Sequence, residues 1–233
     1  MSPKQKNSPV LLVPKELGDD FCPIGYRANP FAQQYNDFTS DGLFQQAVYD
    51  QAILRARILG IARIIDLGCG AAQKSRKYSS RFEVIGVDLP QVVENLRSYT
   101  VVDTKTRRGF TAFEHDFNRD VLSFPGDRPT IIIAADVIEH LADPAYLLSS
   151  IRKSLWGGVR RTFISTPCRE HNDGCRKEGP PFNPTHVREW SCDEFLKLME
   201  HHGLRVLESS HVPERPDSPG KGTFLVEVID DGT

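Results

Sequence analysis

Short runs of apolar, mostly β-branched residues alternate along the chain with segments in which apolar residues recur at three- and four-residue spacings. The runs are typical of buried parallel strands, and the spaced segments are typical of amphipathic helices. We predict strands at residues 63–67, 84–88, 109–114, 130–135, 161–166, 204–209 and 222–229. We predict helices that begin near residues 43, 72, 90, 144 and 192. This alternation predicts an α/β fold.

Residues that start and stop secondary structure fall between these elements. Pro90 and Pro144 stand where proline is tolerated, in the first turn of a helix. Ser191 and Glu194 have the spacing of a capping box at a helix N-terminus. Residues 213–220 are rich in proline and charge, and we expect them to form a hairpin-like loop before the last strand.

The run at residues 64–70 ends in two glycines that stand two positions apart. This pattern predicts a buried strand followed by a tight turn. Gly68 can take a positive φ at little steric cost, and Gly70 has no side chain to block a bound molecule. A helix opening at Ala72 would point its free N–H groups at the same ligand. The stretch therefore predicts a binding site at the end of this strand.

A second buried run ends in Asp88, about 20 residues after the glycines. In βαβ nucleoside sites, an acid at this distance hydrogen-bonds the ribose hydroxyls. Position 73 is Gln73, so the dinucleotide fingerprint G-x-G-x-x-G is absent, and no lysine follows in P-loop spacing. The order strand, glycine turn, helix, strand and acid predicts a nucleoside ligand other than a dinucleotide.

Residues 66–70, 86–88 and 136–141 together resemble the successive motifs of class I S-adenosylmethionine-dependent methyltransferases. The last motif resembles the small-molecule branch, which includes quinone and sugar O-methyltransferases. The resemblance covers residues 63–165. It implies a Rossmann-like, doubly wound, seven-stranded sheet that is mostly parallel, with an antiparallel last strand and helices on both faces. Ala72 stands near the place of a third family glycine, and alanine is small enough to keep the site open.

The resemblance also implies S-adenosylmethionine as the cofactor. An acid after the third strand accepts from the adenine amino group in this family, and Asp116 matches that position. Alternatively, Asp116 and Asn118 cap a turn. The cofactor contacts that we expect are Asp66, Gly68, Cys69, Gly70, Asp88, Leu89, Asp116, Phe117, Ala135 and Asp136.

Two segments are candidates for contacts with the methyl acceptor. Residues 167–190 have no clear period, contain glycine and several prolines, and follow the fifth strand on the ligand side of the sheet. We interpret them as an acceptor-binding loop inserted in a methyltransferase domain at residues 43–233. The N-terminal extension, residues 1–42, is rich in aromatic residues, which either cover the site or anchor the extension to the core. The expected acceptor contacts are Tyr26, Arg27, Phe31, Tyr35, Asn183, His186, Arg188 and Trp190.

Methyl transfer from a sulfonium needs mainly alignment of the acceptor, but a hydroxyl acceptor also benefits from a base. His140 is the first candidate, because an unperturbed imidazole titrates at a pKa of about 6.5 and the residue follows the fourth strand. Alternatively, His140 orders the loop by hydrogen bonding. His186 is the second candidate base, and Glu139 could orient His140 or bind the acceptor.

Metal binding is a weaker hypothesis. Zinc ligands often come in tight pairs, and no C-x2-C pair occurs in the chain. Magnesium bound by Asp136 and other acids is not marked by any motif. We therefore predict free thiols and no metal, although five ligand-type residues cluster along the sequence at Cys168, His171, Cys175, His186 and Cys192.

The composition narrows the classes of function and of binding partner that remain. The 233 residues carry a formal net charge of −2, which gives no electrostatic case for nucleic acid or an anionic membrane surface. No apolar run approaches a membrane span, and five scattered cysteines suit a reducing cytoplasm. We predict a cytoplasmic enzyme with a small-molecule acceptor and no nucleic-acid or membrane partner. The oligomeric state is open, with a homodimer as one alternative.

The function that follows is methyl transfer to a hydroxyl of a small molecule, with a sugar or glycan precursor as the favoured acceptor. The acceptor loop is polar, whereas a lipid quinone would need an apolar tunnel. Methylation of a small amine or amino sugar is the alternative within this class. A non-catalytic S-adenosylmethionine-binding or scaffold protein is the alternative from another class.

Overall fold

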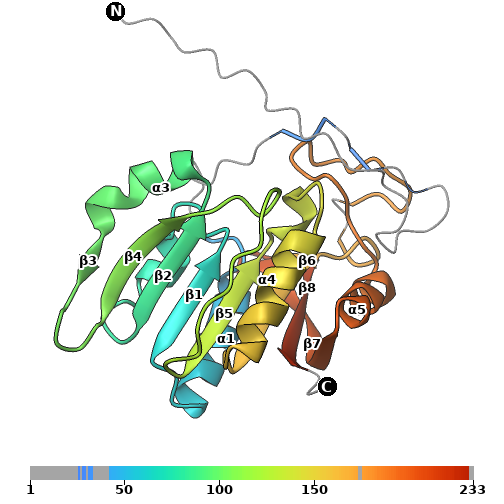
Figure 1. The fold of residues 1–233 in the computed structure, drawn as a ribbon. Coiled ribbons are helices and arrows are strands. Elements are labelled where there is room, and N and C mark those ends of the chain that lie inside the picture. The colour runs from blue at the N-terminus through green and yellow to red at the C-terminus, as the bar shows by residue number, and fades with distance from the viewer. Residues whose placement is uncertain (1–25, 27, 30, 34–41, 173–174, 231–233) are drawn as a thin grey trace, which may run out of the picture.

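The computed structural model of the chain describes residues 26, 28–29, 31–33, 42–172 and 175–230, without the side chains of residues 218–221 and 230. One mixed sheet runs through it in the order β3-β4-β2-β1-β5-β6-β8-β7 (Figure 1). The strands are β1 (Arg63–Leu67), β2 (Glu83–Asp88), β3 (Val101–Val102), β4 (Gly109–Glu114), β5 (Thr130–Ala135), β6 (Arg161–Pro167), β7 (Leu204–Arg215) and β8 (Ser218–Asp230). The α-helices are α1 (Gln46–Ile58), α2 (Gln73–Arg76), α3 (Pro90–Leu96), α4 (Ala145–Trp156) and α5 (Cys192–His201), with 3-10 turns η2 (Arg97–Tyr99) and η3 (Ile138–His140).

The predicted α/β sheet is confirmed, with one more strand than predicted. The five strands β4, β2, β1, β5 and β6 are parallel, and β8 lies antiparallel between β6 and β7. The additional strand is β3, a two-residue edge strand that pairs antiparallel with β4. The pattern does not reveal β3, because two consecutive valines before a polar connection are too short to show a period.

The hairpin of β7 and β8 corrects a second prediction. The sequence predicts a hairpin-like loop at residues 213–220, and the hairpin is present, but its turn is shorter because β7 continues to Arg215 and β8 begins at Ser218. Pro213 pairs with Gly222 in the ladder. Because β7 is the edge of the sheet, the missing N–H of Pro213 leaves no neighbouring strand unpaired, and the proline does not end the strand.

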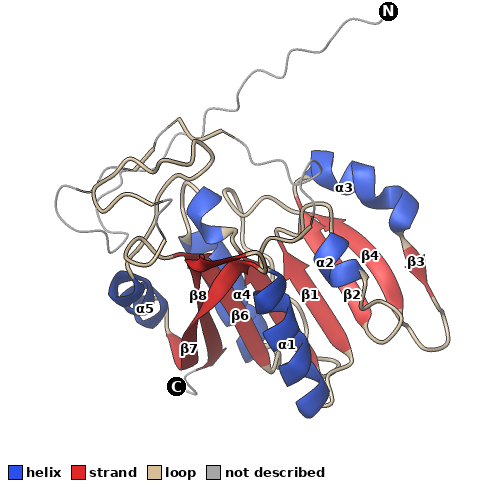
Figure 2. Cartoon of the chain, turned by 180° about the vertical axis from the view of Figure 1, so that it is seen from behind, coloured by secondary structure: helices blue, strands red, loops and turns tan. Residues whose placement is uncertain are grey.

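Two apolar cores lie on opposite faces of the sheet. Successive residues of a strand point to opposite faces, so Ile132 joins the core under α4 and α5, while Ile131 and Ile133 join the core under α1. Figure 1 shows α4 and α5 in front of the sheet, and the view from behind in Figure 2 shows α1 and α2 in front of it. Helices therefore cover both faces, as the doubly wound fold requires.

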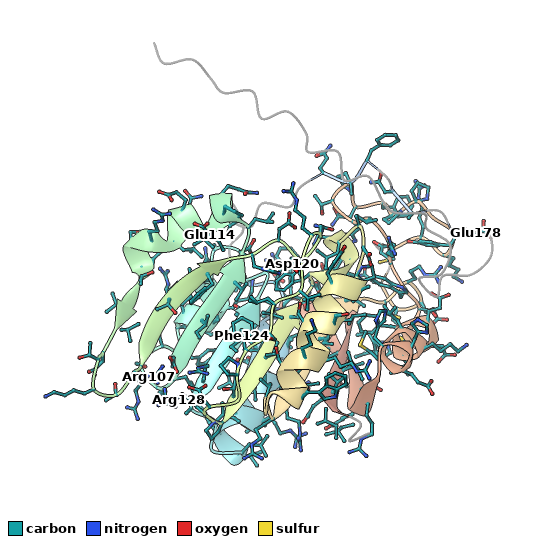
Figure 3. All side chains as sticks on the ribbon, viewed as in Figure 1. Arg107, Glu114, Asp120, Phe124, Arg128 and Glu178 are labelled. Carbon is teal, nitrogen blue, oxygen red and sulfur yellow. The ribbon has the colours of Figure 1, made fainter. Side chains whose placement is uncertain are left out.

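The two ends of the strands differ in their chemistry. At the amino end, Glu83 accepts from Arg63 at 2.9 Å, from Arg128 at 2.7 Å and from Arg107 at 3.4 Å. Figure 3 shows Arg107 and Arg128 at this end, while Glu114, the last residue of β4, lies at the other. These four ionisable groups of the amino end are thus paired with one another. The glycine turn and the loop at residues 168–190 lie at the carboxyl end, where open α/β sheets bind ligands.

Among the residues that the structure describes, no helix is long and apolar enough to cross a membrane.

Candidate active site

The glycine turn begins where β1 ends. Gly68 has a φ of +67°, a conformation that residues with side chains rarely adopt, and its N–H donates to the carbonyl of Val87 at 2.8 Å. A Cβ at this position would lie 2.4 Å from Cγ2 of Val137. Both the backbone conformation and the packing against Val137 therefore require glycine, and the turn is held close to the segment after β5.

Asp88 closes the turn from the neighbouring strand. Its Oδ2 accepts from the N–H of Gly70 at 2.8 Å, and its Oδ1 accepts from the N–H of Leu89 at 2.7 Å. The structure thus brings together Gly70 and Asp88, which the sequence predicts to act at one site. The ribose contact that we expect for Asp88 stays a prediction.

Asp66 lies beneath the turn as a buried residue of β1. Its Oδ1 accepts from the hydroxyl of Tyr49, on α1, at 2.8 Å. Burial raises the pKa of Asp66 to about 6, against the hydrogen bond from Tyr49, which lowers it. The pKa of this buried carboxyl therefore lies well above that of an exposed aspartate.

The other predicted cofactor contacts lie at the edges of this turn. Cys69 is buried and its N–H donates to Val87 at 3.2 Å, while Ala135 is half-buried at the end of β5. Asp116 accepts from the N–H of Asn118 at 2.9 Å and pairs with Arg119 at 3.1 Å, so it caps a turn as in the alternative interpretation. Phe117 belongs to the apolar core rather than to an open surface. The adenine contact of Asp116 stays a prediction.

Asp136 follows β5 with a left-handed backbone, at a φ of +51°. The hydroxyl of Ser165 donates to its Oδ1 at 2.9 Å, and the amide of Gln45 donates to its Oδ2. Burial raises the pKa of Asp136 to about 7, against the hydrogen bond from Ser165. A strained backbone and a shifted carboxyl at the same residue are typical of functional sites.

His140 lies one turn further, at the end of η3. Its Nδ1 lies 2.8 Å from the carbonyl of Thr185, so Nδ1 carries the proton and Nε2 keeps its lone pair. Burial, assisted by the nearby His186, lowers the pKa of His140 to about 3. A pKa this low keeps His140 neutral in the physiological range, and its role as the base stays a prediction.

His186 reaches the same place from the acceptor loop. The ring centroids of His140 and His186 are 5.0 Å apart. Nε2 of His186 lies 2.9 Å from Nδ2 of Asn183, and its Nδ1 lies 2.7 Å from Oε1 of the buried Glu189. An amide nitrogen can only donate, so His186 carries its proton on Nδ1 and donates it to Glu189. The loop thereby fixes the orientation of this imidazole.

Glu139 forms a cluster with His140 and His186. It is fully buried, accepts from the hydroxyl of Thr166 at 3.3 Å, and has a pKa raised well above its ordinary value by burial and by Asp136. Glu139, His140 and His186 each place one ligating atom within 4.8 Å of the others. The sequence predicts no metal here, but carboxylate and imidazole ligands at these distances could hold a divalent ion.

Backbone contacts bind the acceptor loop to this cluster. The N–H of Val187 donates to the carbonyl of Glu139 at 2.7 Å, and Tyr26 accepts from the N–H of Glu189 at 2.8 Å. The N–H of Asn29 donates to Val187 at 2.6 Å. The described part of the N-terminal extension therefore runs along the loop. Arg27 and Tyr35, also expected to contact the acceptor, lie outside the described residues, and Phe31 is exposed.

Two of the residues predicted to contact the acceptor, Arg188 and Trp190, are buried in the structure. Trp190 is fully buried in the core, where its ring centroid is 5.8 Å from that of Phe195. Arg188 is buried as well, donates to the carbonyl of Ala142 at 2.7 Å, and has a pKa lowered to about 10 by burial. Both residues belong to a polar loop, but the last residues of that loop turn back to the sheet, where Cys168 and Trp190 form a bridge.

Four residues of the site are missing from the sequence prediction. Glu189 stands three residues after His186, and Ser165 lies near the carboxyl end of the buried strand β6, so the local sequence offers a signal for both. Gln45 and Tyr49 left none, because their partners Asp136 and Asp66 are remote in the sequence.

Comparisons with known proteins identify the family of the chain. A family model described as a methyltransferase domain matches residues 42–209, which span the glycine turn, the cluster and the acceptor loop. The chain belongs to this methyltransferase family. It is a class I S-adenosylmethionine-dependent methyltransferase, and its cofactor is S-adenosylmethionine. A search of curated proteins found no match.

Solved structures of methyltransferases share the fold. The methyltransferase domain of bacterial CtHen1 is 21% identical, with 79% of this chain and 97% of that chain covered and a TM-score of 0.57. A 1,6-didemethyltoxoflavin-N1-methyltransferase of Burkholderia thailandensis, solved with S-adenosylhomocysteine, is 17% identical, with 80% of each chain covered and a TM-score of 0.55. A magnesium protoporphyrin IX methyltransferase of Synechocystis PCC 6803, solved with S-adenosylmethionine, is 13% identical, with 80% and 79% covered and a TM-score of 0.52.

The residues of the turn fit S-adenosylmethionine. Glycines at positions 68 and 70 keep side chains off the turn, and the carboxylates of Asp66 and Asp88 offer acceptors for the amino and hydroxyl groups of the cofactor. The cofactor supplies a methyl group that its sulfonium has already activated. What the chain must add is binding, alignment of the acceptor and a place for its proton.

Proposed function

We propose that this methyltransferase methylates a hydroxyl oxygen of a small, polar acceptor, and we favour a sugar or glycan precursor. The observation that carries the proposal is the cluster of Asp136, Glu139, His140 and His186 beyond the carboxyl end of β5. Val137, within this segment, packs against Gly68 of the glycine turn. The cluster is therefore adjacent to the cofactor turn.

A hydroxyl acceptor explains why ionisable groups gather here. Its pKa lies well above neutral, so oxygen attack is assisted by a group that takes the proton. Asp136, with a pKa of about 7, is close to half ionised at neutral pH and matches this task best. Burial and the neighbouring Asp136 raise the pKa of Glu139 well above its ordinary value, and we assign this fully buried carboxyl no proton-accepting role.

The imidazoles have a different role in this proposal. His140 is neutral, with its proton directed at Thr185, and we assign its imidazole to positioning the acceptor hydroxyl. His186 is held by Glu189 and Asn183 and orients the acceptor from the loop side. In this arrangement His140 positions the hydroxyl and Asp136 takes its proton.

The polar character of the loop supports a hydroxylated acceptor. Asn183 and Thr185 supply amide and hydroxyl groups beside His186, and their own hydrogen bonds fix them in place at 2.8 to 3.0 Å. Groups fixed in this way suit a ligand that is recognised by hydrogen bonds, such as a sugar. A lipid acceptor would call for an apolar lining instead.

The test begins with calorimetric titration of S-adenosylmethionine and S-adenosylhomocysteine, with NAD as the control. Labelled methyl transfer is then measured for a panel of sugars and nucleotide sugars, each beside its amino-sugar counterpart. We expect incorporation into the hydroxylated members, loss of turnover in Asp136→Asn, and no loss in the exposed control Asp217→Asn.

Three outcomes would contradict the proposal. Incorporation into the amino sugars alone would replace it with N-methylation. Cofactor binding without transfer to any member of the panel would favour a binding protein. Turnover that vanishes with a chelator and returns with a divalent ion would give the proton-accepting role to a metal at Glu139, His140 and His186.

A further inference from the structure

A second cluster of metal-ligating side chains lies at the base of the acceptor loop. Cys168 directly follows β6, and the N–H of His171 donates to its carbonyl at 3.1 Å in the next turn. Cys192 is the first residue of α5, behind the Ser191 cap, and His211 stands on β7 opposite Phe224 of β8. Three segments that are separate in sequence thus place two thiols and two imidazoles together.

The distances within this cluster are short. Sγ of Cys192 lies 2.7 Å from Sγ of Cys168 and 3.2 Å from Nε2 of His211, and neither cysteine forms a disulfide. The ring centroids of His171 and His211 are 4.2 Å apart, with the rings nearly perpendicular. One ligating atom of each of the four residues lies within 4.8 Å of all the others.

We propose that Cys168, His171, Cys192 and His211 bind a structural zinc ion. Zinc takes four ligands in a tetrahedron, at about 2.3 Å from sulfur and about 2.0–2.1 Å from nitrogen, which puts the ligating atoms roughly 3.3–3.8 Å apart. Sγ of Cys192 and Nε2 of His211, 3.2 Å apart, lie near that spacing, and all four ligating atoms lie within 4.8 Å of one another. Rotation of the two cysteine side chains brings their sulfurs to it.

The choice of donors selects the ion. Thiolate and imidazole together favour zinc over magnesium and calcium, which prefer oxygen. Four protein ligands leave no open coordination position, which is typical of structural rather than catalytic sites. Cys168 is buried, whereas His171 and His211 are exposed and leave the ion a path from solvent.

The position of the cluster indicates what a bound zinc ion would do for the structure. Cys168 and Trp190 form a bridge at the two ends of the loop, and the N–H of Arg169 donates to the carbonyl of Trp190 at 2.9 Å. Zinc would join the first residues of this loop to α5 and to the edge strand β7. It would therefore hold the base of the segment that carries His186, without touching the glycine turn.

The experiment measures zinc in the full chain after purification in the presence of zinc and removal of loosely bound metal. We expect about one zinc ion per chain for the wild type. Cys168→Ser and His211→Gln should lose it, while Cys175→Ser, a change at another cysteine of the loop, should keep it. Cobalt added to the metal-free wild type should give the visible absorption of tetrahedral thiolate-bound cobalt, which reports on the site even if a variant fails to fold.

Three results would overturn the proposal. One is a wild type that takes up neither zinc nor cobalt. Another is a zinc content that Cys168→Ser and His211→Gln leave unchanged but His186→Gln abolishes, which would place the ion at Glu139 and the two active-site imidazoles. The third is a Cys168–Cys192 disulfide, found by mass spectrometry of the unreduced protein, in a chain without metal.

Discussion

The N–H of Gly70 donates a 2.8 Å hydrogen bond to Oδ2 of Asp88, and this bond joins the ends of β1 and β2. The same carboxylate accepts from Leu89 through its other oxygen. The acid is thus fixed on the glycine turn, with its position set by backbone groups. A ligand that contacts the turn meets this carboxylate without any rearrangement of the chain.

We expect Asp88→Ala to weaken the binding of S-adenosylmethionine by about 1–3 kcal/mol, because charge-assisted hydrogen bonds to the cofactor are lost. In a titration this is roughly a 5- to 150-fold rise in Kd. Glu94→Ala, at an exposed acid of α3, is the matched control and should bind as the wild type does. An unchanged affinity of Asp88→Ala would rule out the ribose contact.

Gly68→Ala and Gly60→Ala separate backbone strain from steric overlap. Both glycines have a positive φ, of +67° and +62°, but a Cβ at Gly60 meets nothing within 4 Å, whereas one at Gly68 lies 2.4 Å from Val137. Strain alone should lower the free energy of unfolding of Gly60→Ala by about 1–2 kcal/mol. Gly68→Ala should lose about 1–3 kcal/mol more through overpacking. Chemical denaturation measures both, and equal losses would show that Val137 yields without cost.

Local patterns were sufficient for most elements of the fold. The apolar run at residues 130–135 predicts β5 with its observed bounds. The spacing of Ser191 and Glu194 predicts the capping box, in which Ser191 accepts at 3.3 Å and Glu194 accepts at 2.8 Å. These features depend on neighbours a few residues away, so their chemistry is visible in the sequence itself.

The parts that the sequence does not predict depend on contacts between distant segments. Gln45 is 91 positions away from Asp136 in the sequence, and no local pattern indicates that its amide donates to that carboxylate. Trp190 stands in a polar segment, yet it enters the core because the loop returns to pair with Cys168. His140 has the residue type of a base, but burial alters its pKa in a way that only the fold determines.

The pH dependence of stability should carry a contribution from Asp66. Its pKa rises from an ordinary value of 3.8 to about 6 on folding, so between these values the folded state binds more protons than the unfolded state. The free energy of unfolding should therefore fall as pH rises from about 4 to about 6, by on the order of 3 kcal/mol from this group. Asp66→Asn should flatten this part of the curve. Denaturation at several pH values with both proteins measures the difference, and parallel curves would contradict the assignment.

The pH dependence of turnover distinguishes Asp136 from His140 as the proton acceptor. A carboxyl with a pKa of about 7 is protonated below that value, so the rate at saturating substrate should rise with pH and level off above about 7. His140→Gln should lower turnover but keep the inflection and the affinity for S-adenosylmethionine, because His140 does not titrate in this range. Loss of the inflection in His140→Gln would instead make the imidazole the base.

Gln45 offers a test of how the carboxyl of Asp136 is tuned. Its amide donates to Oδ2 of Asp136 and, at 3.1 Å, to the hydroxyl of Thr223. A donor favours the ionised form of a carboxyl, so Gln45→Met should raise the pKa of Asp136 above about 7 and move the inflection of the rate profile to higher pH. Gln46→Met, whose amide donates to Asp50 on the same helix, is the control and should leave the inflection in place. If Gln45→Met lowers turnover equally at every pH, Gln45 supports the fold of the site and does not tune its acid.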